Sequence, residues 1–269
     1  MEIIHNIEEG EPSAADLVLD LLITHSEPSM TVQALARAGE IMGISTPSVR
    51  VALTRLLGQD RIVKTGRGCY AVQLQGNSAH YEVQHWFEKE SRMGPWPGGW
   101  LVVHDGDVAR SDKTAWRHHL RALDLNGFRT LGAGLAVRPD NLDGGADAMR
   151  AALARLGLAA GSAVFAGSGF DADAAARMQT LWDVPALSAA YRGALKLIED
   201  SNARLPRMAP EAAARETLLV GRTVIRGIVR DPLLPEAIQP GAPRRALIEA
   251  TRAYQARARS LWQEVLAAA

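Results

Sequence analysis

The sequence predicts an α+β protein built in three parts, which cover residues 1–78, 79–170 and 171–269. In the first part, a helix with one apolar and one polar side runs into a short alternating hairpin. In the middle, short apolar strands alternate with amphipathic helices. From Asp171 onward the apolar residues keep only helical spacing, so the last part is expected to be all-helical.

The bulk composition favours a cytoplasmic protein without a membrane partner. The 269 residues are 47% hydrophobic, which supports real cores, and the formal net charge is zero, with 30 basic and 30 acidic residues. Cys69 is the single cysteine, so a disulfide framework and a cysteine-rich zinc site are excluded. The acidic start of the chain does not look like a signal peptide. No uncharged apolar run reaches the ~18 residues that a membrane span requires.

The first part is expected to contain three helices. Ser13 caps the first, over residues 13–25, and Thr31 caps the second, which Gly43 ends. Ser45 or Thr46 caps the third, and Pro47 suits its first turn. Apolar residues that face inward are expected at Leu35, Ala38 and Met42 in the second helix and at Val49, Leu53 and Leu56 in the third.

A basic hairpin follows the third helix. Residues 61–64 and 70–74 form its strands, and Gly66-Arg67-Gly68 forms its tip. Helix, helix, helix and hairpin is the order of a winged helix-turn-helix, whose third helix enters the major groove of DNA while the wing contacts backbone. The residues expected to bind DNA are Ser45, Thr46, Ser48, Arg50, Thr54, Arg55, Lys64 and Arg67.

The local charge agrees with this interpretation. From Ser45 to Tyr70 there are five cations and one anion, Asp60, which makes a net charge of +4. Because the whole chain is neutral, attraction to nucleic acid has to come from such a patch. A solvated basic helix and hairpin without a ligand is the alternative interpretation.

The middle part is expected to begin with a connecting helix over 79–93, followed by a Pro/Gly-rich break. Strands are predicted at 100–104, within 128–137 as a pair, and at 162–166, with helices over 111–126 and 146–156 between them. Strand, helix, strand, strand, helix, strand is the split βαβ, ferredoxin-like order. Trp116, Leu120, Leu123 and Leu125 are expected mostly on one side of the first helix.

With these elements in place, the chain resembles the PaaX family of bacterial transcriptional repressors, named for the control of phenylacetate catabolism. The resemblance spans nearly the whole chain. Its motifs are the third helix (residues 48–56), Trp96-Pro97-Gly98-Gly99-Trp100, Gly127-Phe128 followed by Arg138-Pro139-Asp140-Asn141-Leu142, and Arg230-Asp231-Pro232-Leu233-Leu234-Pro235. The resemblance implies a homodimeric repressor of a catabolic operon for aromatic compounds, with an inverted-repeat operator in double-stranded DNA. It also implies release by a small-molecule effector, such as an aryl-acyl coenzyme A thioester.

An effector site is predicted in the last part. Arg222, Arg226 and Arg230 recur every four residues, so they line one helix face that can bind phosphate or carboxylate. Trp182 and Tyr191 are candidates to pack against an aromatic ring. Ordinary salt bridges explain the arginines equally well, and a place in the core explains the aromatic residues.

Two further functions stay open at this point. The middle part also resembles small CRISPR-type nucleases of the same fold, in which an aspartate after the first strand holds a metal, and Asp105 lies near that place. One carboxylate makes a poor metal site, and the adjacent His118 and His119 diverge on a helix. The second alternative function is that of a winged interaction module that does not bind DNA. No cofactor, metal or catalytic residue is therefore expected.

Overall fold

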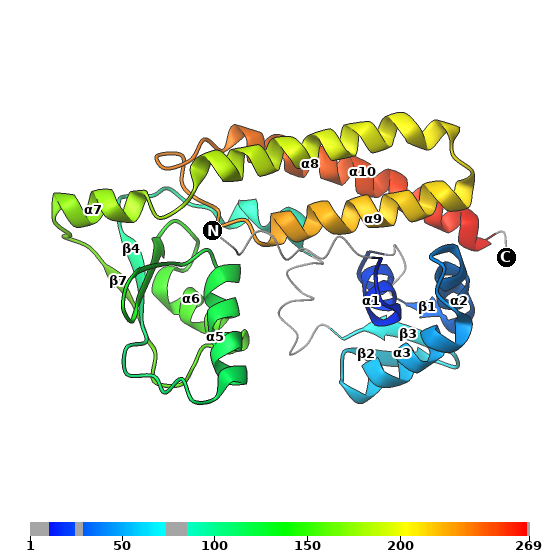
Figure 1. Cartoon of the computed structure of the whole chain (residues 1–269), viewed down its shortest axis with the longest axis horizontal. Coiled ribbons are helices and arrows are strands. Elements are labelled where there is room, and N and C mark those ends of the chain that lie inside the picture. The colour runs from blue at the N-terminus through cyan, green and yellow to red at the C-terminus, as the bar shows by residue number, and fades with distance from the viewer. Residues whose placement is uncertain (1–10, 25–28, 74–84, 268–269) are drawn as a thin grey trace. The chain divides into compact units, whose positions relative to one another are not determined.

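The structure is a computed structural model, and it describes residues 11–24, 29–73 and 85–267. The fold is mixed α+β, with two antiparallel sheets and a helical C-terminal part. The chain forms two compact units (Figure 1). Unit 1 comprises Met1–Leu74, Ser201–Arg222 and Tyr254–Ala269, and unit 2 comprises Gln75–Asp200 and Thr223–Ala253. Both units therefore take segments from the C-terminal helices.

The N-terminal segment of unit 1 contains three helices and a three-stranded sheet. Its elements are α1 (Ala14–Thr24), β1 (Met30–Thr31), α2 (Val32–Ile41), α3 (Thr46–Gly58), β2 (Ile62–Gly66) and β3 (Cys69–Val72). The sheet has the order β1-β3-β2, with both pairs antiparallel.

The helix starts confirm the predicted caps. The hydroxyl oxygens of Ser13, Thr31 and Ser45 accept hydrogen bonds from backbone N–H groups three residues on, at 3.2, 3.1 and 3.3 Å. Each bond satisfies one of the amide donors that a helix start leaves unpaired. Gly43 follows α2 with φ +74°, a left-handed conformation that costs glycine little.

The core of unit 1 is completed by residues that come from the other end of the chain. Leu17, Leu35, Met42, Val49, Leu53 and Leu56 are buried together, as the sequence predicted for the residues of α2 and α3. Ala214, Leu218, Trp262 and Val265 belong to the same cluster. They come from α9 (Pro210–Val229) and α10 (Ala242–Ala267).

Unit 2 contains the four-stranded sheet. Its elements are β4 (Trp100–His104), α5 (Lys113–Leu125), β5 (Arg129–Gly132), β6 (Leu135–Pro139), α6 (Gly145–Arg155) and β7 (Ala163–Gly167). The strand order is β5-β6-β4-β7, and every pair is antiparallel. Val102 on β4 lies opposite Val137 on β6 and Phe165 on β7.

Both faces of this sheet carry apolar residues that are buried. On one face, Leu101 and Val103 pack with residues of α5 and α6, which lie side by side in Figure 1. On the other face, Trp100, Val102 and Val137 pack with Met178 of α7 (Ala172–Gln179) and with Trp182 and Leu234. Strand residues that alternate between two covered faces explain why β4 reads as a continuous apolar run.

The C-terminal part is helical, as predicted. Besides α7, it contains α8 (Val184–Arg204), a short 3-10 turn η3 (Leu205–Arg207), α9 and α10. Asp231-Pro232 follows one residue after the end of α9, at the stop that the sequence predicted. No helix among the described residues is long and apolar enough to cross a membrane.

Two local predictions are wrong. The connecting helix over 79–93 falls partly outside the described residues, and residues 86–92 form two 3-10 turns, η1 (Trp86–Glu88) and η2 (Glu90–Arg92). These turns bury Trp86 and bring the Lys89 ammonium to carbonyl oxygens at the end of α9. In α5, Leu120 is 47% exposed and the buried face carries His119 in its place.

Candidate nucleic-acid interface

The two sides of α3 differ sharply in burial. Val49, Ala52, Leu53 and Leu56 are buried, and they hold the helix against the core of unit 1. Ser48, Arg50, Val51, Thr54 and Arg55 are exposed. The exposed side is therefore rigidly presented, because the buried side fixes how the helix is rotated about its axis.

The close approach of α2 and α3 depends on Gly39. A Cβ atom at this position would lie 2.7 Å from Cγ2 of Val49 and 3.0 Å from the carbonyl oxygen of Ile44. Any larger side chain pushes α3 away from α2, so the position and tilt of α3 depend on this glycine.

Gly39→Ala is expected to lower the free energy of unfolding by about 1 kcal/mol. The overpacking penalty of about 1–3 kcal/mol exceeds the helix-propensity gain of at most about 1 kcal/mol. Gly58→Ala is the matched control, because Gly58 lies on the same helix pair with nothing within 4 Å of its Cβ position. Chemical denaturation of both variants measures the difference. A Gly39→Ala protein as stable as Gly58→Ala would contradict the close contact.

The hairpin adds two exposed cations to this surface. Lys64 lies on β2, and Arg67 lies at the tip beside Gly68, whose φ is +71°. The pairing of β2 with β3 shifts register between Lys64 and Gly66, which is a bulge that bends the hairpin. Half-buried Tyr70 packs against the core of unit 1 from β3.

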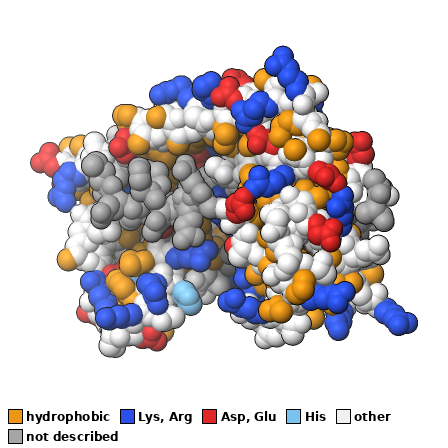
Figure 2. Space-filling model, turned by 45° about the vertical axis from the view of Figure 1, so that its right-hand side comes forward, with side chains coloured by type: hydrophobic (Ala, Val, Ile, Leu, Met, Phe, Trp, Pro, Cys, Tyr) orange, Lys and Arg blue, Asp and Glu red, His pale blue; other side chains and the backbone are white. Residues whose placement is uncertain are grey.

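The cations of this surface differ from other arginines of unit 1 in their pairing. Within the described part of the chain, no carboxylate forms an ion pair with Arg50, Arg55, Lys64 or Arg67. Other arginines of unit 1 are paired: Arg37 with Glu40 and Glu211, Arg204 with Glu216, and Arg222 with Asp16 and Asp20. Figure 2 shows basic side chains along the lower right of the molecule, the level that α3 and the hairpin occupy in Figure 1.

The predicted DNA-binding residues that carry hydroxyl groups have partners within unit 1. Ser45 caps α3, and its hydroxyl lies 2.8 Å from that of Ser48. The Thr46 hydroxyl is placed to donate to Glu40 at 3.5 Å. Ser45 and Thr46 lie at the N-terminal end of α3, where free backbone N–H groups favour an anion such as phosphate.

The predicted effector residues do not form one cluster of free groups. Arg222 belongs to unit 1 and is paired with two carboxylates, whereas Arg226 is half-buried and Arg230 is exposed in unit 2. Trp182 is buried, stacks on Trp100 at 6.1 Å and donates from Nε1 to the carbonyl of Gly127 at 3.2 Å. Sequence reasoning did not anticipate that Asp16 and Asp20 of α1 would pair with Arg222.

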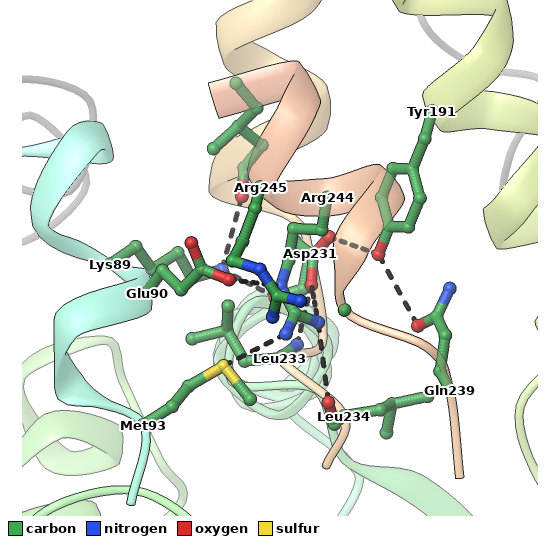
Figure 3. A network of polar contacts seen from close by, with 12 residues as sticks. Lys89, Glu90, Met93, Tyr191, Asp231, Leu233, Leu234, Gln239, Arg244 and Arg245 are labelled. Carbon is green, nitrogen blue, oxygen red and sulfur yellow. Dashed lines mark hydrogen bonds and ion pairs between the residues drawn. The ribbon is translucent and has the colours of Figure 1, made fainter. Parts of the chain in front are cut away.

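Tyr191 belongs to a buried polar network around Asp231 (Figure 3). Its hydroxyl donates to Oδ2 of Asp231 at 2.6 Å, while Oδ1 accepts from the backbone N–H of Leu233 at 2.7 Å. Burial first, and then the neighbouring Asp231 carboxylate, raise the pKa of Tyr191 well above its ordinary value, so the phenol remains a donor. The Arg244 guanidinium lies 3.9 Å from Oδ1.

Lys89 and Arg244 anchor the same network from other segments. Nζ of Lys89 donates to the carbonyls of Val229 and Asp231 at 2.5 and 2.6 Å, which satisfies acceptors left open at the end of α9. Arg244 also contacts Glu90 at 3.4 Å and the sulfur of Met93 at 3.3 Å. The network gives Asp231, Leu233 and Leu234 of the Arg230–Pro235 motif a structural role.

The other motifs of unit 2 meet at the same place. Arg138 is 1% exposed and donates to the carbonyl of Asn126 at 2.5 Å and to Oδ1 of Asn141 at 3.0 Å. Asn141 in turn donates to the carbonyl of Leu233 at 2.8 Å. Burial lowers the pKa of Arg138 to about 10. Motifs distant in sequence are therefore held together by buried hydrogen bonds.

Asp105, the candidate nuclease residue, is buried and already has partners. Its Oδ2 lies 2.8 Å from Nε2 of His119, and Nη2 of Arg110 lies 3.7 Å from Oδ1. Nδ1 of His119 accepts the backbone N–H of Ala159 at 3.2 Å, so Nε2 carries the proton that is donated to Asp105. Among the described residues there is no group of three or more His, Cys, Asp or Glu side chains placed to hold a metal ion.

Comparison with known proteins gives a fold-level similarity. No protein-family model matches the chain, and no curated protein matches it. Among solved structures, the chain is similar to an uncharacterised protein, Rv0674, from Mycobacterium tuberculosis. The TM-score is 0.59 at 23% identity, and the match covers 93% of this chain and 99% of the other. At this identity the similarity concerns the fold over nearly the whole length of both chains.

Proposed function

We propose that the protein is a DNA-binding transcriptional repressor of the PaaX type, with α3 as the helix that reads DNA and the β2–β3 hairpin as its wing. The observation that carries the proposal is the exposed face of α3 and the hairpin, with four cations that have no acidic partner among the described residues. Unpaired cations on a rigid face give phosphates an attractive surface, because no internal ion pair has to be broken first.

The element order supports this assignment. In unit 1, the sequence α1-β1-α2-α3-β2-β3 with sheet order β1-β3-β2 agrees with a winged helix-turn-helix. In unit 2, the sheet order β5-β6-β4-β7 places the second, third, first and fourth strands of the unit side by side. This order agrees with the ferredoxin-like arrangement. The resemblance to PaaX repressors implies these two arrangements together with a helical C-terminal part.

The repressor is proposed to act as a homodimer on an inverted repeat. A single α3 reaches only a few base pairs, which is too little information to find one site in a genome. Two copies related by a two-fold axis double the contact, and half-sites are expected about one helical turn apart or a multiple of it. Release by an anionic aromatic acid or its coenzyme A thioester is proposed on the resemblance alone.

The two alternatives lead to different expectations. The interaction module predicts no sequence-selective DNA binding, although the unpaired cations of α3 favour binding. The nuclease predicts metal-dependent cleavage through Asp105, but its carboxylate is buried and bonded to His119 and Arg110. A repressor binds DNA without cutting it.

The test is selection of DNA from a random duplex library by the full-length chain, followed by titration of the selected sequence at several salt concentrations. The proposal predicts an enriched inverted repeat bound at least about 10³-fold more tightly than unrelated DNA. Failure to enrich any sequence, or cleavage of the bound DNA, would contradict it.

Single substitutions on the interface should weaken binding in two distinct ways. Arg50→Ala and Arg55→Ala are each expected to cost about 1–3 kcal/mol of binding free energy. Lys64→Ala and Arg67→Ala should weaken all sequences alike and lower the salt slope by about 0.9 for each phosphate that the variant no longer neutralises. Fluorescence anisotropy with a labelled operator measures both quantities.

Arg259→Ala is the matched control for these variants. Arg259 is an exposed arginine of unit 1 on α10, away from α3 and the hairpin in the chain. It carries the same charge, so loss of overall positive charge is the same in control and test variants. If Arg259→Ala reduces operator affinity as much as Arg50→Ala, binding is a general charge effect and the interface is wrongly assigned.

A further inference from the structure

The centre of the exposed face of α3 is apolar. Successive residues of an α-helix are about 100° apart, so Val51 and Thr54 lie about 60° from each other on the side opposite the buried residues. Arg50 and Arg55 lie further round the helix, one on each flank. All four side chains are exposed. This order places two branched, methyl-bearing side chains between two cations.

Val51 is unusually exposed for its type. It is 68% exposed, compared with 47% for Leu120 and 44% for Phe165, the next most exposed large hydrophobic residues in the described part of the chain. The buried side of α3 is complete without it, since Val49, Leu53 and Leu56 fill the core. Valine also forms helices less readily than alanine, so neither helix formation nor packing within unit 1 accounts for a valine here.

Thr54 has no free hydrogen-bond donor. Its hydroxyl donates to the carbonyl oxygen of Arg50, one turn back, at 3.1 Å. A base that meets Thr54 therefore meets its methyl group or the lone pairs of its oxygen. The side chains of Val51 and Thr54 therefore offer no hydrogen-bond donor to a base acceptor in the major groove.

Resting on the proposed function, we infer that Val51 and Thr54 read the 5-methyl group of pyrimidines, which in ordinary DNA is the methyl of thymine. In the major groove this methyl is the apolar group that distinguishes one base pair from the others, and apolar side chains are its usual contacts. Arg50 and Arg55 then reach outward to the phosphates or base edges on either side. The middle of each half-site should therefore contain A·T pairs.

The test compares thymine with uracil in the operator that the full-length protein selects. Replacing one thymine by deoxyuridine removes a methyl group and leaves base pairing intact. For the wild-type protein, deoxyuridine at one or two positions per half-site should reduce affinity about four-fold, the effect of losing one buried methyl. Refilling the position with 5-methylcytosine opposite guanine measures how far the methyl alone restores affinity.

Protein variants assign the effect to residues. In Val51→Ala and Thr54→Ser, which lack the γ-methyl groups of the parent residues, the penalty for deoxyuridine at the matching position should disappear. Thr54→Val keeps a methyl and removes the hydroxyl, so it should retain the penalty. Both positions are on the solvent side of α3, and folding of the three variants is checked by thermal denaturation without DNA.

The outcomes separate this inference from the proposed function. An enriched operator whose affinity is unchanged by deoxyuridine at every thymine, or whose penalty persists in both Val51→Ala and Thr54→Ser, would overturn the methyl contact and leave the repressor intact. If no operator is enriched, both are wrong. Position-specific penalties that vanish in the matching variant support the inference.

Discussion

Gly127→Ala is expected to lower the free energy of unfolding by about 3 kcal/mol. Gly127 has φ +73°, where an alanine is strained by about 1–3 kcal/mol. A Cβ atom there would also lie 2.8 Å from both Cα and the carbonyl oxygen of Pro232, and these backbone atoms cannot turn aside as a flexible side chain would. The two effects act together, so the loss is large for the addition of a single methyl group.

Gly169→Ala separates the two effects. Gly169 lies in the same unit with φ +74°, and nothing lies within 4 Å of its Cβ position. It reports the conformational strain alone, about 1 kcal/mol. Denaturant titrations measure the free energy of unfolding of both variants, and the difference between their losses is the cost of the contact with Pro232. Equal losses in the two variants would show that Gly127 and Pro232 do not touch.

The local elements were predictable because they depend on short-range rules. The caps at Ser13, Thr31 and Ser45 follow from side chains that accept the first free amide bonds of a helix, and the periodicity of Val49, Leu53 and Leu56 follows from the helical repeat. The alternation of strands and helices in unit 2 was equally predictable from the sequence. Both β4 and α6 lie within a residue of the predicted ranges.

The division of the C-terminal helices between the units was not predictable in the same way. Leu218 and Trp262 fill the core of unit 1, yet their spacing indicates only that they lie on an apolar helix face. Which core they join depends on contacts between segments some 200 residues apart, as in the pairing of Arg222 with Asp20. A single sequence contains no periodic signal for such contacts.

The candidate interface was predicted better than the candidate effector site for a related reason. Exposure on α3 follows from one helix repeat, so Arg50, Thr54 and Arg55 could be placed from their neighbours. Val51 was missed because an apolar residue two positions from Val49 is easily taken for core. Its 200° offset from both Val49 and Leu53 on the helix was the signal that could have found it. An effector pocket requires residues from several helices, which spacing on one helix does not reveal.

Asp231→Ala is expected to lower the free energy of unfolding by about 3–5 kcal/mol, since it removes the acceptor at the centre of a buried network. The carboxylate accepts from the Tyr191 hydroxyl and from the Leu233 N–H, and it faces the buried Arg244 guanidinium. Without it, two donors and a charge stay buried with fewer partners. Leu233 also has φ +52°, a strained conformation for a branched residue that the bond to Asp231 holds in place.

Two milder variants separate the contributions to this loss of unfolding free energy, because each removes a different part of the network. Tyr191→Phe removes a single buried hydrogen bond and should cost about 1–2 kcal/mol. Asp231→Asn keeps the shape and an acceptor for Leu233 but removes the charge that faces Arg244, so its cost should fall between the other two. Thermal and denaturant unfolding of the three variants give this order. If Asp231→Ala costs no more than Tyr191→Phe, the carboxylate neither balances Arg244 nor holds Leu233, and the Arg230–Pro235 motif must be explained by something other than this network.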